Sequence, residues 1–451
     1  MSLVSDRPVV GEPRPWHFPS FQRQTVAGGR VLTAHLPGRP LAVTALVADA
    51  GASAEPIGRE GIAELVARAL SEGTTSRDAH GFAVAGERLG ATWRASTDWD
   101  SLRCGFEVPV GELGAATELL AEAVRSAAFA DATLARVRDE RIDEVGIDRS
   151  QPATRAAEAF AAEVFADLSR YHRSDGGDVA SLSAITNDDV RDYRSARLTP
   201  SASTLVVVGD LDTVDVEALG RTVFDGWADN AAEPAAPDVQ PRGGGRRTVV
   251  VDRPGSVQSM LMVGHDGPPR KVEDYVAMST MALVLGGMFS SRLNLKIREE
   301  KGYAYGAFGG FDTRKHGGVF VARAAVQSEV TLPALADLVA EIERMQDGGV
   351  ERDELEQARA YRAGVFPISF AGVMAVASGL GDLVIHDFPD DHFDQLRQRV
   401  LDVRKDELDS SAATHLRPED LVTVVVGDAS GFAKDLESAG LGPVSIVPDE
   451  S

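Results

Sequence analysis

Arg298 and Tyr305 are the residues of this sequence whose types and spacing best suit a chemical site. An arginine guanidinium presents five N–H donors in a fixed plane, and a tyrosine presents one phenolic O–H donor. Such donors suit a carbonyl oxygen that gains negative charge during hydrolysis. The structural alternative is that Arg298 only complements a helix dipole and Tyr305 only favours a strand.

A short helix followed by a strand is predicted to position this pair. The serine pair at 290–291 can cap the start of the helix, and Gly302 can end it in the left-handed conformation. A strand over Tyr303–Phe308 is expected next. In that strand Tyr305 can project with Arg298 toward a common point.

Glu64 and Arg68 form a second polar group, on a helix predicted over 60–70. A glutamate four residues before an arginine is a favourable helical pair, and two solvated charges are the simplest interpretation. The nine histidines include no pair at the spacing His-x-x-x-His, so no imidazole zinc site is evident. The chain also lacks Gly-x-Ser-x-Gly, and its glycine-rich stretch 306–310 lacks the lysine of a phosphate loop.

Composition excludes several classes of function. The 451 residues carry 46 Lys plus Arg against 69 Asp plus Glu, a formal charge of -23 that disfavours nucleic acid as a partner. The single cysteine, Cys104, excludes an internal disulfide framework. The first 20 residues lack the apolar core of a signal peptide, and no apolar run is long enough to span a membrane. A cytoplasmic protein without a membrane partner is expected.

An internal repeat divides the chain in two. The segment Val206–Asp210 recurs as Val424–Asp428, and a Leu-x-Pro triplet precedes each copy at the same offset. The stretch 227–247 between the copies is rich in proline, alanine and glycine and has no apolar periodicity. We therefore expect domains over 20–226 and 248–432, joined by a linker over 227–247.

The coarse pattern of each half predicts α+β architecture. Hairpin-like strands come first, helices follow, and each copy closes with a β-branched strand after a helix. Strands and helices therefore group together and do not alternate as βαβ units. Two equivalent domains are expected, each a mostly antiparallel sheet flanked by helices.

The segments Leu285–Leu293 and Ile297–Tyr305 resemble the second-half signature of the pitrilysin and insulinase (M16) peptidase family, which includes the mitochondrial processing peptidases. The resemblance covers about 20–430 and implies that each chain forms half of a clamshell. It also implies that Arg298 and Tyr305 bind substrate.

The same resemblance implies a zinc site in the first half that has lost its ligands. The family's His-x-x-Glu-His frame falls on Glu64, Ala67 and Arg68, which replace the first histidine, the catalytic glutamate and the second histidine. Glu144 stands where the family has its third ligand. Two carboxylates beside Arg68 oppose a divalent cation, so a salt bridge among Glu64, Arg68 and Glu144 is expected instead. Arg94 replaces an asparagine that binds substrate in catalytic members.

These features resemble those of the non-catalytic subunit of a two-chain bacterial member of the family. The resemblance implies no metal in this chain, a zinc-bearing His-x-x-Glu-His partner in a heterodimer, and an unfolded peptide substrate. The peptide is expected to add as an extra strand to a sheet edge. The alternative is an inactive scaffold or binding protein, like the core subunits of respiratory complexes.

Overall fold

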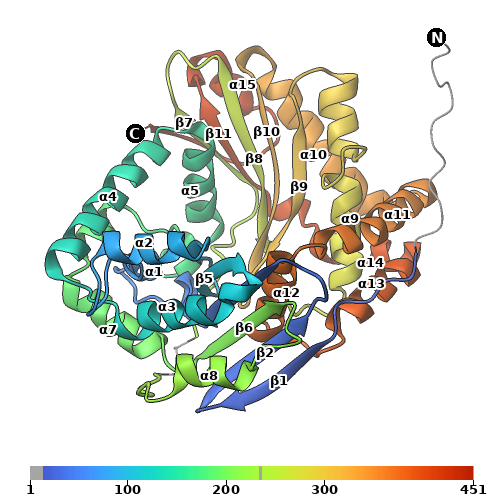
Figure 1. Ribbon diagram of the computed structural model, residues 1–451. Helices are drawn as coiled ribbons and strands as arrows, with labels where there is room; N and C mark the ends of the chain where they lie inside the picture. The colour runs from blue at the N-terminus through green and yellow to red at the C-terminus, as the bar shows by residue number, and fades with distance from the viewer. Residues whose placement is uncertain (1–13, 233–235, 450–451) are drawn as a thin grey trace, which may run out of the picture.

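The computed structural model describes residues 14–232 and 236–449, which form two α+β halves joined by an extended segment (Figure 1). Residues 1–13, on which the expectation of no signal peptide partly rests, and residues 233–235 of the predicted linker lie outside the described residues. The rest of the linker is extended and pairs with the first half through an antiparallel bridge between Phe165 and Pro241.

The first half contains one six-stranded sheet in the order β1-β2-β6-β3-β5-β4. Only the pair β2 and β6 is parallel. The strands are β1 (Phe21–Val26), β2 (Gly29–His35), β3 (Leu41–Ala48), β4 (Thr92–Thr97), β5 (Leu102–Pro109) and β6 (Ser203–Gly209). The helices are α1 (Ile62–Ala69), α2 (Ala79–Arg88), α3 (Leu113–Ser126), α4 (Asp131–Arg149), α5 (Pro152–Val164), α6 (Val179–Ala184), α7 (Asn187–Arg197) and α8 (Val216–Phe224).

The second half contains a six-stranded sheet in the order β12-β7-β11-β8-β10-β9, in which the five strands from β7 to β9 repeat the pairing from β2 to β4 of the first sheet. The outer strand differs, because β12 is parallel to β7 whereas β1 is antiparallel to β2. Its strands are β7 (Arg247–Asp252), β8 (Gln258–Gly267), β9 (Ala307–Thr313), β10 (Gly318–Gln327), β11 (Val422–Gly427) and β12 (Val444–Pro448). Its helices are α9 (Tyr275–Leu285), a π-helical segment (Asn294–Glu300), α10 (Thr331–Gly348), α11 (Arg352–Ser369), α12 (Val373–Ile385), α13 (His392–Asp402), α14 (Lys405–His415) and α15 (Ala433–Leu436). The predicted α+β class with two equivalent, mostly antiparallel sheets is confirmed.

The repeated Val-Val-Val-Gly-Asp motif forms the same structure in both halves. Its valines lie in β6 and β11, central strands that are buried at every residue. Its aspartate then holds the turn of a neighbouring hairpin. Asp210 accepts a hydrogen bond from the backbone N of Gly38 at 2.8 Å, and Asp428 accepts one from the backbone N of Gly255 at 2.8 Å. The carboxylates of the motif therefore have a structural role.

The two halves exchange helices across their interface (Figure 1). Helix α12 of the second half packs on β6 and β3 of the first sheet, and α5 of the first half packs on β11 and β8 of the second. Val206 and Val208 contact the α12 side, whereas Leu205 and Val207 face the first-half core. One face of each sheet is therefore covered by a helix of the other half, and the hydrophobic effect holds the two halves together.

A turn between β9 and β10 also fastens the second half to the first. The guanidinium carbon of Arg314 lies 4.1 Å from the ring centroid of Trp99 and 4.6 Å from that of Tyr171. The backbone N of Lys315 donates to Oδ2 of Asp100 at 2.8 Å. Burial raises the pKa of Asp100 to about 6, despite this hydrogen bond.

No single helix among residues 14–232 and 236–449 has the length and apolar composition of a membrane span. Helices α11 and α12 together meet that criterion only as a pair bent by 109°.

Candidate functional site

Helix α1 carries three of the residues named from the sequence. Gly61 at its start has a φ of 95°, and a Cβ there would lie 2.8 Å from the carbonyl oxygen of Gly176. The buried carboxylate of Glu55 accepts the backbone N–H groups of Gly61 at 3.1 Å and Ala63 at 2.8 Å. This carboxylate satisfies N–H groups that a helix start leaves free, so the orientation of α1 is fixed.

The structure brings Glu64, Arg68 and Glu144 together. Nε of Arg68 lies 2.7 Å from Oε1 of Glu64 on the same helix. The guanidinium also reaches Glu144 on α4, with N–O distances of 2.8 and 2.9 Å to the two carboxylate oxygens. Arg68 therefore links α1 to α4 through a two-point contact with Glu144, the geometry that suits a guanidinium best.

Neighbouring groups complete this cluster. The hydroxyl of Thr97, at the end of β4, donates to Oε2 of Glu64 at 2.9 Å, and Arg141 lies 3.2 Å from Oε2 of Glu144. The hydrogen bond from Arg68 holds the pKa of Glu144 below its ordinary value. The hydrogen bond to Glu144 is the main cause of a raised pKa for Arg68. Both charges are thus stabilised by their contact.

These residues do not fit a zinc ion. The carboxylates of Glu64 and Glu144 already accept hydrogen bonds from Arg68, and Arg68 holds its positive charge between them. No imidazole is present at these positions, and zinc sites are built from histidine and cysteine with carboxylates in a minor part. The arrangement provides a structural link between α1 and α4.

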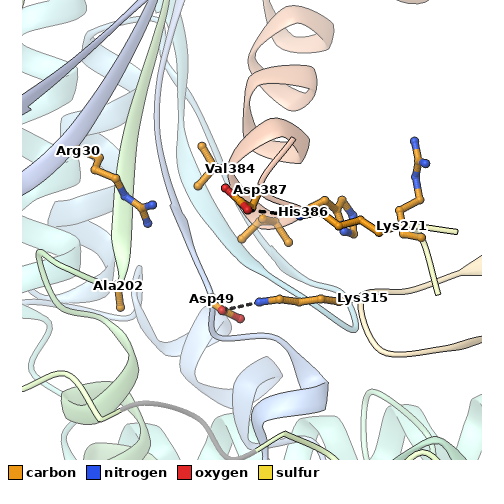
Figure 2. A pocket seen from close by; sticks show the side chains of 10 residues that line it. Arg30, Asp49, Ala202, Lys271, Lys315, Val384, His386 and Asp387 are labelled. Carbon is orange, nitrogen blue, oxygen red and sulfur yellow. Dashed lines mark hydrogen bonds and ion pairs between the residues drawn. The ribbon is translucent and has the colours of Figure 1, made fainter. Parts of the chain in front are cut away.

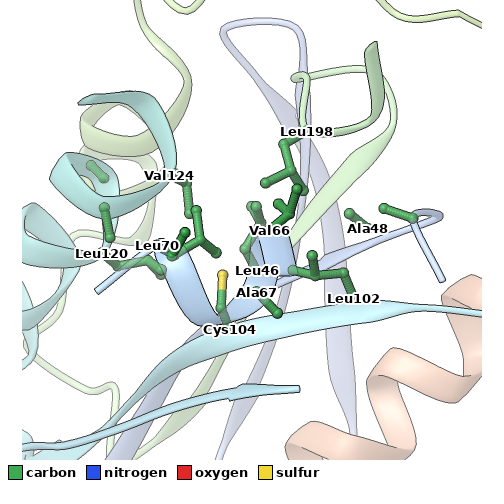
Figure 3. Close-up of a cluster of buried hydrophobic side chains, with 14 of the residues drawn as sticks. Leu46, Ala48, Val66, Ala67, Leu70, Leu102, Cys104, Leu120, Val124 and Leu198 are labelled. Atoms are coloured by element: carbon green, nitrogen blue, oxygen red, sulfur yellow. The ribbon is translucent and has the colours of Figure 1, made fainter. Parts of the chain in front are cut away.

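Ala67, predicted from the sequence to replace a catalytic glutamate, faces the core. Figure 3 shows Ala67 among Leu46, Val66, Leu102 and Cys104 in the buried cluster of the first half. Ala67 is 1% exposed, so its side chain is packed on all sides by apolar groups. Helix α1 therefore presents Glu64 and Arg68 to the polar side and apolar residues to the core.

Arg298 and Tyr305 lie where the second half turns from helix to strand. The strand predicted over Tyr303–Phe308 is wrong in its start. Arg298 is in the π-helical segment, and Gly302 ends it with a φ of 66°. Strand β9 begins only at Ala307, so Tyr305 precedes it. The reason is local: the backbone N of Tyr303 donates to the carbonyl of Ile297 at 2.9 Å. Residues just before β9 thus cap the helix and do not pair with a strand.

Both side chains are open to solvent. Tyr305 is 97% exposed, and the side chain of Arg298 is 37% exposed. Arg298 lies 3.3 Å from Oε1 of Glu299, and its guanidinium carbon lies 4.4 Å from the ring centroid of Phe289. No hydrogen bond joins Arg298 to Tyr305 in the described part of the chain. Both donors are therefore free to approach a ligand.

Phe289 was not singled out from the sequence. Its only signal in the sequence is that it is an aromatic residue among glycines and serines. Its contact with Arg298 depends on a turn that spacing alone does not reveal.

The outer edges of the two sheets differ. Within the described residues, no strand pairs with the outer side of β4, so its backbone groups are available to an added strand. The outer side of β9 is partly occupied by a bridge between Gly309 and Gly286. Arg94, the altered position, lies on β4 and lines a largely apolar cavity of 220 Å³ between β5 and α12.

One further group of potential metal ligands occurs among the described residues: His35, Asp210 and Asp212. Nδ1 of His35 accepts a hydrogen bond from the backbone N of Leu211 at 3.0 Å, so the neutral ring carries its proton on Nε2. That proton faces Asp212 at 3.3 Å. Since Asp210 also holds the turn at Gly38, these residues are explained by hydrogen bonding without a metal.

A cavity of 340 Å³ lies between the two halves (Figure 2). Two of its lysines are already paired with carboxylates: Lys315 with Asp49 at 2.7 Å, and Lys271 with Asp387 at 3.3 Å. The C-terminal end of α12 also borders the cavity, and its carbonyl groups favour cations. The two lysines are therefore explained by their ion pairs within the fold.

Known protein families match both halves of the chain. Residues 30–169 match the family described as insulinase (peptidase family M16), and 184–361 match the peptidase M16 inactive domain. An uncharacterised zinc protease of Mycobacterium leprae is 27% identical over 292 residues, which are 64% of this chain and 65% of that protein. The zinc protease PqqE of Helicobacter pylori is 24% identical over 384 residues, 83% of this chain and 85% of that protein.

Solved structures share the fold. The peptidase M16 inactive domain from Pseudomonas fluorescens aligns with a TM-score of 0.84 at 23% identity, covering 90% of this chain and 98% of that one. A protease from Helicobacter pylori gives 0.85 at 21% identity, covering 91% and 100%. A chain of complex III2 from Candida albicans gives 0.77 at 12% identity, covering 94% and 99%.

Proposed function

Because this chain belongs to the M16 (insulinase) peptidase family, we propose that it is the zinc-lacking subunit of a two-chain peptidase. The partner is a family member that carries an intact His-x-x-Glu-His site, and the two chains close a chamber around an unfolded peptide. In this assignment zinc belongs to the partner, and this chain contributes substrate binding.

The proposal rests mainly on the residues that occupy the predicted zinc-site positions, here called the degenerate site: Glu64, Ala67, Arg68 and Glu144. Arg68 holds both remaining carboxylates, Glu64 and Glu144, and the apolar side chain of Ala67 is packed in the core. Restoring a water-activating site would require replacing Arg68 and inserting a carboxylate at position 67. An autonomous zinc peptidase is therefore disfavoured by the residues of the site.

The second half supplies the groups that would bind substrate. Arg298 and Tyr305 are solvent-exposed donors on one connection, and no carboxylate in the described residues neutralises Arg298 except its neighbour Glu299 at 3.3 Å. Donors aimed at a peptide carbonyl stabilise the negative charge that forms on its oxygen during attack. The chemistry of water activation would come from the partner chain.

An extended peptide is the substrate class that best suits this fold. The outer side of β4 exposes unpaired backbone groups, and a peptide added to a sheet edge is bound mainly through its backbone. Binding of this kind requires an unfolded segment and tolerates varied side chains. Arg94 on that strand makes this edge less suited to basic peptides than to neutral or acidic ones.

Co-expression with a zinc-bearing family member tests the proposal. The purified pair should cleave a quenched peptide that neither chain cleaves alone. Replacing Arg298 with alanine should lower kcat/KM roughly tenfold to a hundredfold, the worth of one charged hydrogen bond, and Tyr305→Phe about fivefold. Arg352→Ala, a change at an exposed arginine of α11, is the matched control and should have no effect.

The second candidate is a scaffold or binding subunit of a larger assembly. The similarity in fold to a chain of complex III2 supports it. A pull-down that returns such an assembly and no zinc peptidase, together with unchanged turnover in the Arg298 and Tyr305 variants, would favour this second candidate.

A further inference from the structure

Phe289 is the aromatic residue in contact with Arg298. Its ring centroid lies 4.4 Å from the guanidinium carbon of Arg298, within the distance of a cation–π interaction. Phe289 is nevertheless 67% exposed, so core packing does not explain a phenylalanine at this position. The ring covers one face of the guanidinium and leaves its N–H edge available.

The backbone before Phe289 is held rigidly. Gly286 forms a bridge with Gly309 on β9, and a Cβ on Gly286 would lie 2.2 Å from the backbone N of Gly309. Met288 is buried, so its side chain anchors the turn from the other side. The backbone from which the Phe289 ring projects is thus packed against β9.

Few other contacts restrain Arg298. Among residues 14–232 and 236–449, its remaining charged contact is Glu299 at 3.3 Å, an exposed neighbour in sequence. Exposed ion pairs of this kind hold a long side chain only weakly, because the lost side-chain entropy offsets the attraction. The aromatic face is the second restraint on Arg298, and it projects from a backbone packed against β9.

We propose that Phe289 is a positioning residue for Arg298. Its ring holds the guanidinium in the orientation in which it meets a peptide carbonyl, so that less side-chain freedom is lost on binding. This inference rests on the proposed function for its effect on catalysis. The restraint on Arg298 itself is a property of the isolated chain.

NMR relaxation of the arginine Nε–H groups in the isolated full chain tests the restraint. Phe289→Leu removes the aromatic face and should increase the mobile population of the Arg298 side chain roughly twofold to fivefold. Phe289→Trp keeps an aromatic face and should restore the restraint. Unchanged order of Arg298 in Phe289→Leu, with the fold intact by thermal unfolding, would overturn the proposal.

Phe308 provides a matched control. It is 43% exposed, and its ring centroid lies 5.1 Å from the guanidinium carbon of Arg323. Phe308→Leu should loosen Arg323 and leave Arg298 unchanged, whereas Phe289→Leu should do the reverse. If both variants loosen both arginines, the effect is general disorder and the proposal is wrong.

Turnover of the reconstituted pair separates this inference from the proposed function. Phe289→Leu should reduce kcat/KM by the same twofold to fivefold, Phe289→Trp should rescue it, and Arg298→Ala should make the Phe289 change silent. If Arg298→Ala has no effect on turnover, the proposed function fails. The NMR result then still decides whether Phe289 restrains the side chain of Arg298. If Arg298→Ala impairs turnover but Phe289→Leu does not, only the positioning role fails.

Discussion

Replacing Arg68 with methionine tests whether the cluster of Glu64, Arg68 and Glu144 stabilises the fold. Arg68 contacts Glu64 at 2.7 Å and Glu144 at 2.8 and 2.9 Å, and about one third of its side chain is exposed (33%). Partly exposed pairs contribute up to about 1 kcal/mol each, so the two together contribute up to about 2 kcal/mol. Methionine keeps the length and apolar stem of the side chain but leaves two carboxylates facing each other.

Urea unfolding followed by far-UV circular dichroism measures this loss. A decrease of about 2 kcal/mol lowers the Tm of a chain of this length by only roughly 2 °C, so the urea midpoint is the more sensitive quantity. Arg352→Met is the matched control. It removes a helical pair with Glu356 at 3.4 Å whose arginine is largely exposed, and should cost less than about 0.5 kcal/mol.

The pH dependence gives an independent check. Arg68 holds the pKa of Glu144 below its ordinary value of 4.5. A depressed carboxyl pKa contributes its full stability above the unfolded value and loses it as pH falls through the folded value. The difference between wild type and Arg68→Met should therefore be complete at pH 7 and shrink below about 4.5. Equal stability of Arg68→Met and Arg352→Met at pH 7, or a difference between wild type and Arg68→Met that is as large at pH 3 as at pH 7, would refute this reasoning.

Two further predictions concern metal binding and the contact between the halves. The double variant Glu64→His, Arg68→His should bind one zinc per chain after dialysis, with Glu144 as the third ligand. It should stay inactive because residue 67 is alanine. If atomic absorption finds no zinc, the positions of residues 64, 68 and 144 no longer suit a zinc site. Burial raises the pKa of Asp100 from 3.8 to about 6, so its ionisation costs stability that grows as pH rises through that window. At pH 8 the free energy of unfolding of Asp100→Asn should thus exceed that of wild type by up to roughly 3 kcal/mol, measured by urea unfolding. Near pH 4 the two proteins should be about equally stable. A variant less stable than wild type at pH 8 would contradict this sign.

Local pattern explains what could be predicted from the sequence. The repeat of Val206–Asp210 at Val424–Asp428 predicted two equivalent halves, because a buried strand and its following turn depend on neighbouring residues. The pairing of Glu64 with Arg68 follows from helical spacing alone. The lack of imidazoles at the degenerate site is likewise a property of the sequence.

Contacts between distant segments could not be predicted in this way. The strand expected from Tyr303 starts at Ala307, because backbone hydrogen bonds back to the helix compete with strand pairing. The contact of Phe289 with Arg298 depends on the bridge between Gly286 and Gly309, which joins a turn to a strand edge.

The sequence by itself determined the two-half α+β organisation and the chemical identity of the groups at both sites, since these depend on residue type and short-range periodicity. Only the tertiary structure decided that α5 and α12 each pack on the sheet of the other half, and that Arg298 lies against an exposed aromatic ring. The physical reason is that burial and electrostatics act between groups close in space, and chain folding, not spacing along the chain, brings those groups together.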